Sequence, residues 1–414
     1  MTTSRRLAEH LDRADLLADF RSRFAIDDET VYMDGNSLGR MPRAAGAMLE
    51  RASTEWSRGL VESWEGWIDL PQQIGAALAP LVGARPDEVT LSDSTSVNLY
   101  KLAWAACEAR PGRPVIVTDS DNFPTDRYVL DAVAAARGGE VRVVEVDPVQ
   151  GITPEALEPA LDDRVALASF SLVSYRSAAF ADMAGIGRTT HASGALTLWD
   201  LSHAVGAVPI DLAGSGADLA VGCTYKYLSG GPGAPAFLYV GAGLQERLTQ
   251  PIHGWFGHAD QFAFDPAFRP APGIERFLVG TPPILSAAAT QPGIETVAEA
   301  GIEAIRAKSE TATAFMLDLY DAVLAPLGVG LATPRDPARR GSHLAFTHPE
   351  GLGITRWMRA ERRVVADFRA PSTIRMAVAP LYTTFAEVWE AVDALREAVA
   401  GRRWREAGGG GPVT

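Results

Sequence analysis

The sequence has only two cysteines, no long apolar run and no excess of basic residues. Cys107 and Cys223 both lie in apolar stretches, so we expect small core residues in a reducing compartment and no disulfide. No CxxC or HExxH motif is present, and we therefore predict no metal site. The formal net charge of −13 argues against nucleic acid or an anionic membrane surface as a partner.

Membrane segments and a secretory signal are absent as well. No apolar stretch is long enough to span a bilayer, and no apolar signal region follows the arginines at positions 5 and 6. We therefore expect a cytoplasmic protein. The 414 residues, 47% of them hydrophobic, suffice for about two to three globular domains with a sizeable core.

Short apolar runs alternate with helical patterns through the middle of the chain. The candidate strands are residues 115–118, 141–146, 165–170, 195–199, 219–223 and 236–240. This alternation predicts an α/β domain with a mostly parallel sheet. Ligands of such a domain bind at the carboxyl ends of its strands.

A proline- and glycine-rich stretch, residues 266–283, separates this pattern from a different one. Beyond it we predict a long helix over residues 286–325, a strand at 373–378 and a helix at 385–400. The predicted division is an N-terminal helix and turn that join the small domain (1–50), a large domain (51–285), a small C-terminal domain (286–407) and a disordered tail (408–414).

A lysine and an aspartate each follow an apolar run. The run at 217–223 leads to Lys226 and a glycine-rich turn, and the run at 195–199 ends in Asp200, with His203 shortly after. Each residue alone is more typical of a solvated loop or a helix cap. Together they predict pyridoxal 5′-phosphate (PLP), because a lysine forms the Schiff base and an aspartate keeps the pyridine nitrogen protonated.

Two further motifs suit the same cofactor. Residues 92–98, Ser-Asp-Ser-Thr-Ser-Val-Asn, precede a helical stretch, where hydroxyls and backbone N–H groups form an anion site. A simple N-cap is the alternative, but the position before the first βα unit of a PLP domain favours a phosphate role. Phe123 lies in a proline turn after a strand, where it either covers a flat cofactor ring or packs in the core.

Six phrases carry a resemblance to a known family. They are YMDGNSLG (32–39), FPTD (123–126), WDLSHAVGAVP (199–209), CTYKYLSGGPG (223–233), GWFGH (254–258) and GTPPILS (280–286). Together they resemble kynureninase, a PLP enzyme of fold type I in the aminotransferase class V group. The resemblance spans about residues 30–390 and implies a large domain with a mostly parallel seven-stranded sheet plus a smaller α+β domain.

The resemblance implies roles for the matching residues. Catalytic roles fall to Lys226 as the Schiff-base lysine, Asp200 as the pyridinium partner and Tyr225 as a candidate proton relay. The implied cofactor-binding residues are Thr95, Ser96, Phe123, Pro124, Thr125, Asp126, Ser171, Asp200, His203, Tyr225, Lys226, Trp255 and Thr281, the last two reaching the site from the partner subunit of a homodimer. The implied substrate-binding residues are Arg375, Ser37, Asn36 and Trp64.

Arg375 is implied to hold the substrate α-carboxylate, since a planar guanidinium matches a carboxylate bidentately. Its alternative is a solvated arginine at a strand end. Thr281 and Trp64 stand near positions where members that favour the 3-hydroxylated substrate carry Asn and His, which weakens the case for recognition of a ring hydroxyl.

The implied reaction is hydrolytic Cβ–Cγ cleavage of L-kynurenine to anthranilate and L-alanine, and the resemblance leaves open whether 3-hydroxykynurenine is cleaved as well. The pathway stays open among tryptophan catabolism, NAD biosynthesis and a specialised route that uses a substituted kynurenine. The alternatives are a cysteine desulfurase, for which neither Cys107 nor Cys223 lies on a mobile segment, and an aminotransferase. A catalytically silent PLP-binding protein is disfavoured because Lys226, Asp200 and Arg375 are all present.

Overall fold

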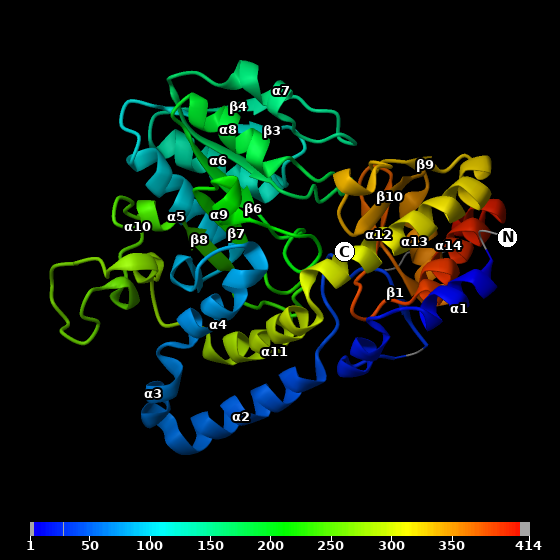
Figure 1. Cartoon of the computed structure of the whole chain (residues 1–414), viewed down its shortest axis with the longest axis horizontal. Helices are drawn as coiled ribbons and strands as arrows, with labels where there is room; N and C mark the ends of the chain where they lie inside the picture. The colour runs from blue at the N-terminus through cyan, green and yellow to red at the C-terminus, as the bar shows by residue number, and fades with distance from the viewer. Residues whose placement is uncertain (1–3, 28, 406–414) are drawn as a thin grey trace.

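The computed structural model describes residues 4–27 and 29–405, which form a larger and a smaller lobe (Figure 1). A seven-stranded sheet lies in the larger lobe, with strand order β2-β8-β7-β6-β5-β3-β4. Its strands are β2 (Val89–Leu91), β3 (Val115–Asp119), β4 (Glu140–Val144), β5 (Val165–Ser171), β6 (Leu196–Asp200), β7 (Leu219–Gly222) and β8 (Phe237–Val240). The strands from β7 to β4 run parallel to one another, and β8 is antiparallel to both β7 and β2.

The α/β class and the mostly parallel sheet are confirmed. The six predicted strands correspond to β3 through β8. Strand β2 was not predicted, because a run of three residues carries no usable periodicity. It lies at the sheet edge and pairs with β8.

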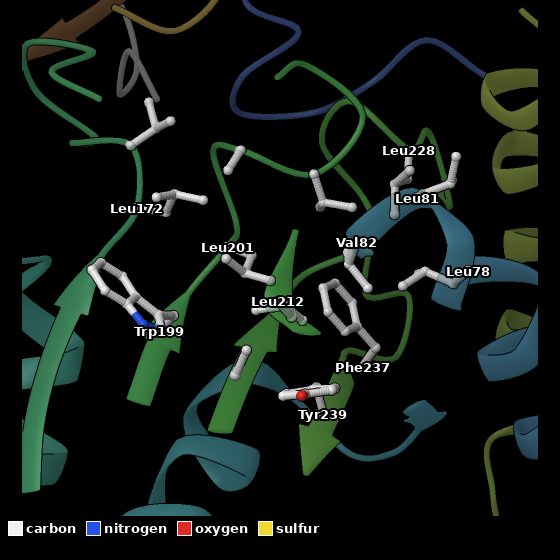
Figure 2. Packing of buried hydrophobic residues seen from close by; sticks show 14 of the residues in the cluster. Leu78, Leu81, Val82, Leu172, Trp199, Leu201, Leu212, Leu228, Phe237 and Tyr239 are labelled. Atoms are coloured by element: carbon white, nitrogen blue, oxygen red, sulfur yellow. The ribbon is translucent and has the colours of Figure 1, made fainter. Parts of the chain in front are cut away.

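The sheet is buried on both faces. In β8, Phe237 and Tyr239 belong to one hydrophobic cluster, whereas Leu238 and Val240 belong to another on the opposite face. Figure 2 shows part of the first cluster, in which Phe237 lies near Val82. Burial on both sides explains why the strands are almost wholly apolar rather than alternating.

Helices cover both faces of this sheet. The helices between residues 43 and 245 are α2 (Arg43–Gly59), α3 (Trp64–Trp67), α4 (Leu70–Leu78), α5 (Thr95–Glu108), α6 (Pro124–Ala136), α7 (Pro154–Leu157), α8 (Met183–Ala192), α9 (Leu212–Ser215) and α10 (Ala242–Gln245), of which α2 and α3 project away from the sheet (Figure 1). Leu102 of α5 and Leu130 of α6 belong to the cluster of Leu238, while Ile74 of α4 and Ile186 of α8 belong to the cluster of the other face.

The smaller lobe contains a four-stranded sheet of order β12-β13-β10-β9. Its strands are β9 (Gly330–Leu331), β10 (His343–Thr347), β12 (Asp367–Arg369) and β13 (Thr373–Ala377), and its helices are α12 (Ile302–Leu319), α13 (Gly351–Arg362) and α14 (Phe385–Ala400). Helix α1 (Arg5–Arg13) lies against α14, and β1 (Val31–Tyr32) pairs with β11 (Val364–Val365) (Figure 1). The N-terminal segment therefore contributes Ala8, Val31 and Met33 to the core of this lobe.

The expected single helix over residues 286–325 was wrong. The structure has α11 (Ile284–Ala300) and α12, separated by Gly301, followed by a π-helical turn at Tyr320–Leu324. Gly301 has φ of 78°, a backbone conformation that glycine adopts without a steric cost, so the helix ends there. The predicted strand at 373–378 and helix at 385–400 correspond to β13 and α14.

The predicted disordered tail, residues 408–414, lies outside the described residues, and the division into domains stays a prediction. Over the part of the chain that the structure describes, no helix combines the length and the apolar character needed to cross a membrane.

Candidate active site

The residues from which a PLP site was predicted lie together at the carboxyl ends of β6 and β7. Strand β6 ends at Asp200, and the turn after β7 carries Lys226. His203 extends from the turn after β6, and its Nδ1 and Nε2 lie 3.2 and 3.4 Å from Lys226 Nζ. Adjacent parallel strands end at the same edge of a sheet, which is why residues 26 positions apart meet here.

Burial sets the protonation of this cluster. It lowers the pKa of Lys226, against the opposing effects of Cys223 and Asp200. Burial, with Lys226 and Arg375, also lowers the pKa of His203 well below its ordinary value, so its imidazole is neutral. Two neutral or weakly basic nitrogens in contact are an arrangement suited to proton transfer at neutral pH.

Asp200 and Asp126 form a pair of buried carboxyl groups near this cluster. Asp200 Oδ1 accepts a hydrogen bond from the Ser202 backbone N–H at 2.8 Å, and both side chains are buried. Burial, followed by the charge of Asp200, raises the pKa of Asp126 well above its ordinary value. Among the described residues, Asp126 Oδ2 has no hydrogen-bond partner, so the pair has an oxygen left for a protonated ring nitrogen.

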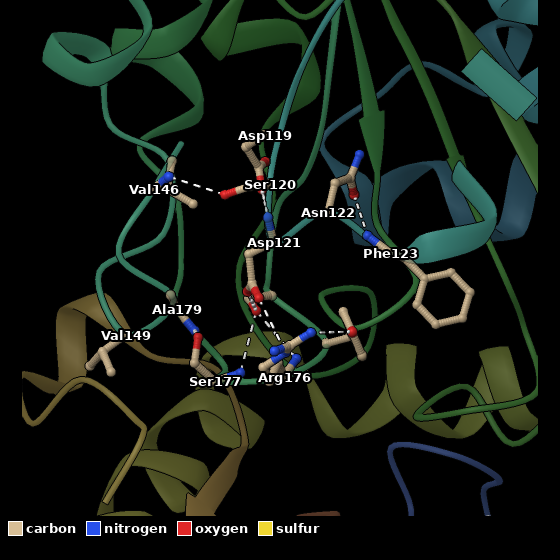
Figure 3. A network of polar contacts seen from close by, with 12 residues as sticks. Asp119, Ser120, Asp121, Asn122, Phe123, Val146, Val149, Arg176, Ser177 and Ala179 are labelled. Carbon is tan, nitrogen blue, oxygen red and sulfur yellow. Dashed lines mark hydrogen bonds and ion pairs between the residues drawn. The ribbon is translucent and has the colours of Figure 1, made fainter. Parts of the chain in front are cut away.

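A polar network holds the turn that leads into α6. Asn122 Oδ1 accepts hydrogen bonds from Ser171 Oγ and from the Phe123 backbone N–H, both at 2.8 Å. Nearby, Asp121 contacts Arg176 at 3.2 Å and accepts a hydrogen bond from Ser174 (Figure 3). Phe123 is thereby fixed as the N-cap of α6, directly before Pro124, Thr125 and Asp126.

The Phe123 ring has a neighbour as well as a fixed backbone. It meets the Tyr175 ring edge to face, with centroids 5.2 Å apart and planes at 85°. Phe123 itself is only partly buried. A partly open ring at the carboxyl ends of the strands is suited to cover a flat cofactor.

The N-terminus of α5 provides an anion site. Thr95 and Ser96 are its first residues, and Ser94 is the N-cap, whose Oγ accepts a hydrogen bond from the Val97 backbone N–H. The first N–H groups of an α-helix have no carbonyl partner within the helix, because no helical turn precedes them. The helix dipole adds positive potential at this N-terminus. Both observations fit the phosphate group of PLP.

The predicted carboxylate anchor, Arg375, is fully buried on β13 rather than solvated at a strand end. Its guanidinium donates to Asp367, to the Tyr175 backbone carbonyl and, at 3.3 Å, to Ser37 Oγ. The predicted substrate residues Arg375 and Ser37 therefore meet, and Asn36 beside them is fully buried. Neither amide atom of Asn36 has a hydrogen-bond partner in the described structure.

Trp64 and Thr281 lie elsewhere in the single chain. Together with Trp56, Trp67 and residues 282–286 they line an apolar cavity of about 480 Å³, which includes no residue from the strand ends. Trp255 is 38% exposed on a short 3₁₀ turn, Trp255–Gly257. Figure 1 shows α3 at the end of the molecule away from the small lobe.

The comparisons with known proteins agree with this geometry. A kynureninase from Pseudomonas fluorescens is 42% identical over 406 residues, which cover 96% of each chain. A kynureninase from Burkholderia mallei is 44% identical over 404 residues, which cover 95% of each. The chain belongs to the kynureninase family. The family model that matches is the kynureninase C-terminal domain, over residues 305–395.

Solved structures show the same fold at low sequence identity. A cysteine desulfurase from Thermococcus onnurineus aligns with a TM-score of 0.80 at 17% identity, covering 92% of this chain and 98% of that one. A variant of C-DES with glycine covalently linked to its PLP cofactor aligns with a TM-score of 0.82 at 19% identity, covering 91% and 99%. Fold type I is therefore confirmed, and PLP is the cofactor that kynureninase membership implies.

Three polar residues beside the predicted kynureninase site were missed in the sequence. Asn122 directly precedes the FPTD phrase, so its position was a usable signal. Asp367 on β12 and His343 on β10 lie on the small sheet, far from every cofactor motif in the chain. Their strands are short, and nothing local distinguishes these residues from ordinary strand residues.

Proposed function

We propose that the protein hydrolyses L-kynurenine to anthranilate and L-alanine with PLP. The carrying observation is the contact of Lys226 with His203 at the ends of β6 and β7, beside the Asp200–Asp126 carboxyl pair. The likeness to two proteins named kynureninase over nearly the whole chain supports this reaction.

The proposed roles follow from the contacts. When bound, PLP supplies a protonated ring that accepts electron density from the substrate. Lys226 Nζ removes the proton from the substrate Cα, which its lowered pKa favours. The Asp200–Asp126 pair holds the proton at the ring nitrogen, while Thr95 and Ser96 at the start of α5 hold the phosphate.

Tyr225 is proposed to assist at the substrate ketone. Its ring lies 5.9 Å from Lys226 Nζ, and its pKa is raised, first by Cys223 and then by burial. A neutral phenol donates a hydrogen bond to the ketone oxygen. Water then adds to the carbon of that ketone. The Cβ–Cγ bond then breaks, so that one kynurenine and one water yield one anthranilate and one alanine.

We also propose a homodimer in the cytoplasm. Trp255 and Thr281 would complete the partner's site, which agrees with the exposed aromatics of the same segment, Phe262 and Phe264. The two buried free thiols agree with a reducing compartment. Burial raises the pKa of both thiols, which gives no support to the cysteine desulfurase alternative.

The direct test is to incubate the PLP-loaded protein with L-kynurenine and to measure anthranilate fluorescence and alanine. We expect equal amounts of both products, and none with the Lys226→Ala variant. Turnover of 3-hydroxykynurenine and of a halogenated kynurenine in parallel would establish the substrate preference. A PLP-loaded protein that converts none of the three would contradict the proposal.

A further inference from the structure

His343 shares one face of the small sheet with the carboxylate anchor. In the register of this sheet, Arg375 lies opposite Ala345 of β10 and opposite Asp367 of β12. Residues directly opposite in an antiparallel pair, and residues two apart in a strand, point to the same face. His343, Arg375 and Asp367 therefore all project from the face that meets the strand ends of the large sheet.

The His343 ring is next to the cofactor residues. Its centroid is 6.0 Å from that of the His203 ring, which in turn contacts Lys226. Lys226 and Arg375 are both close enough to lower its pKa. His343 is thus near both the proposed anchor for the substrate carboxylate and the lysine proposed to act at the substrate Cα.

Both ring nitrogens of His343 lack a hydrogen-bond partner among the described residues, although the side chain is fully buried. The backbone of Arg176 and Tyr175 lies close enough to the ring to raise its pKa, against the effect of burial, but neither contact is a well-formed hydrogen bond. Buried polar groups in native proteins are almost always hydrogen-bonded, so an orphaned imidazole facing a binding site indicates a ligand atom.

The hydrogen bonds that Arg375 already makes within the protein leave room for a second donor to the substrate carboxylate. Three of its five N–H groups donate to Asp367, to Ser37 and to the Tyr175 carbonyl, which leaves the Nε–H and one Nη1–H within the described residues. The charge of Arg375 is also countered by the buried Asp367. A substrate carboxylate has about four acceptor sites, more than the remaining donors of this guanidinium satisfy.

We propose that His343 donates a hydrogen bond to the substrate α-carboxylate, next to Arg375, and so is a substrate-binding residue. Burial, followed by Arg375, lowers the pKa of its imidazole well below the ordinary value. The ring is therefore neutral and carries one N–H and one lone pair. The inference rests on the proposed function in one respect, that the ligand is an α-amino acid.

The test compares His343→Phe, which keeps a ring of similar size without nitrogens, with His343→Gln, which keeps a donor. His348→Phe, in the loop just after β10, is the matched control. Binding to the PLP-loaded protein is followed by its absorbance spectrum, with L-alanine as a ligand that carries the carboxylate. Kynuramine, which is kynurenine without its α-carboxylate, is the second ligand.

We expect His343→Phe to raise the dissociation constant for L-alanine about 10- to 100-fold, as for one hydrogen bond to a charged group. His343→Gln should recover most of this loss, and kynuramine binding should stay unchanged in both variants. Equal weakening of both ligands would show a merely structural role, and unchanged L-alanine binding would overturn the proposal. Kynurenine turnover by the wild-type protein tests the proposed function separately.

If His343→Phe does not fold, the wild-type protein still gives an answer. Its histidines are labelled with ¹⁵N, and the His343 signal is assigned by its loss in His343→Gln. Saturation with L-alanine should shift this signal, whereas an unchanged signal would overturn the proposal.

Discussion

At the scale of single residues, the site depends on polar groups that are buried yet incompletely paired. Lys226 contacts only the neutral His203 at hydrogen-bond distance among the described residues, and Asp126 keeps an unpaired oxygen. Such groups destabilise a protein unless a ligand completes them. Residue-scale predictions therefore concern ligand binding and protonation rather than packing.

Lys226→Ala should abolish anthranilate formation while the fold is retained, because Lys226 is the proposed base for the Cα proton. Borohydride reduction of the PLP-loaded wild-type protein, followed by peptide mapping, should label the peptide that contains Lys226. A label on another lysine, or substantial turnover by the variant, would contradict the assignment.

Arg375→Lys should raise KM for kynurenine on the order of 10-fold or more, because an ammonium group cannot reproduce the fork that contacts Asp367 and the ligand. PLP affinity should change little. Steady-state kinetics and a PLP titration check both parts. A variant that loses PLP while KM is unchanged would assign Arg375 to the cofactor or to the domain contact instead.

Asp119→Asn should change how stability depends on pH. Burial, followed by the charge of Asp121, raises the pKa of Asp119 to about 7 in the folded protein. The folded state then keeps a proton that the unfolded chain releases near pH 4, so this group lowers stability as pH rises from about 4 to 7. The asparagine mimics the protonated form and still accepts the Asp121 backbone N–H, which Asp119 accepts at 2.8 Å.

The expected result is a higher Tm than wild type at pH 8 and a clearly smaller difference at pH 5, measured by thermal denaturation. The gain follows roughly 1.4 kcal/mol per pKa unit and amounts to a few kcal/mol at most. Asp131→Asn, at an exposed position of α6, is the control. An equal shift at both pH values would refute the explanation.

At the scale of elements, Lys101 of α5 connects the phosphate site to a distant segment. Its Nζ donates to Ser92 Oγ at 2.9 Å, to Asp93 at 2.6 Å and to the Phe277 carbonyl at 2.8 Å. Asp93 has φ of 44°, so this loop adopts a conformation that is unfavourable without such support. Lys101 therefore holds both the loop before Thr95 and the segment that leads to Thr281.

Lys101→Met should weaken PLP binding by about 10-fold or more, because the buried carbonyl and the Asp93 carboxylate lose their cation. Fluorescence titration of the apoprotein with PLP measures the effect. Lys101→Arg should recover part of the affinity, since a charged donor is kept. An unchanged PLP affinity in Lys101→Met would show that the loop is held by its other contacts.

At the scale of the whole molecule, the single chain places Trp255, Thr281 and Trp64 in a region apart from Lys226. Trp56 is 59% exposed and Val61 is 77% exposed at the end of α2, so this region presents an apolar surface. Such a surface agrees with the proposed dimer interface. In a two-fold symmetric dimer, each protomer would contribute the same surface to the other.

Mixing the inactive variants Lys226→Ala and Trp255→Ala should therefore restore activity. In the mixed dimer one site carries both changes and the other carries neither, so about half of one dimer's activity should return. Subunit exchange followed by a kynurenine assay measures this, and light scattering establishes the oligomeric state. A monomer at assay concentration, or no recovery in isolated heterodimers, would contradict the composite site.

The sequence by itself determined the parts that depend on neighbours along the chain. The apolar runs β3 and β5 to β8 form strands because their residues are buried on both faces, and Asp200 and Lys226 lie at or just beyond the carboxyl ends of β6 and β7 because of where those runs stop. The phrases around Phe123 and Lys226 likewise placed the chain in its family. Local periodicity and short-range spacing carry all of this information.

Only the tertiary structure decided the substrate side of the site. Its features each depend on segments that are separate in the sequence or on the register of the strands. They are the pairing of Arg375 with Asp367, the unpaired ring of His343 and the cavity shared by Trp64 and Thr281. Which polar group meets which is fixed by strand pairing and by how the two lobes pack. These depend on the burial of the whole core, which no local pattern records.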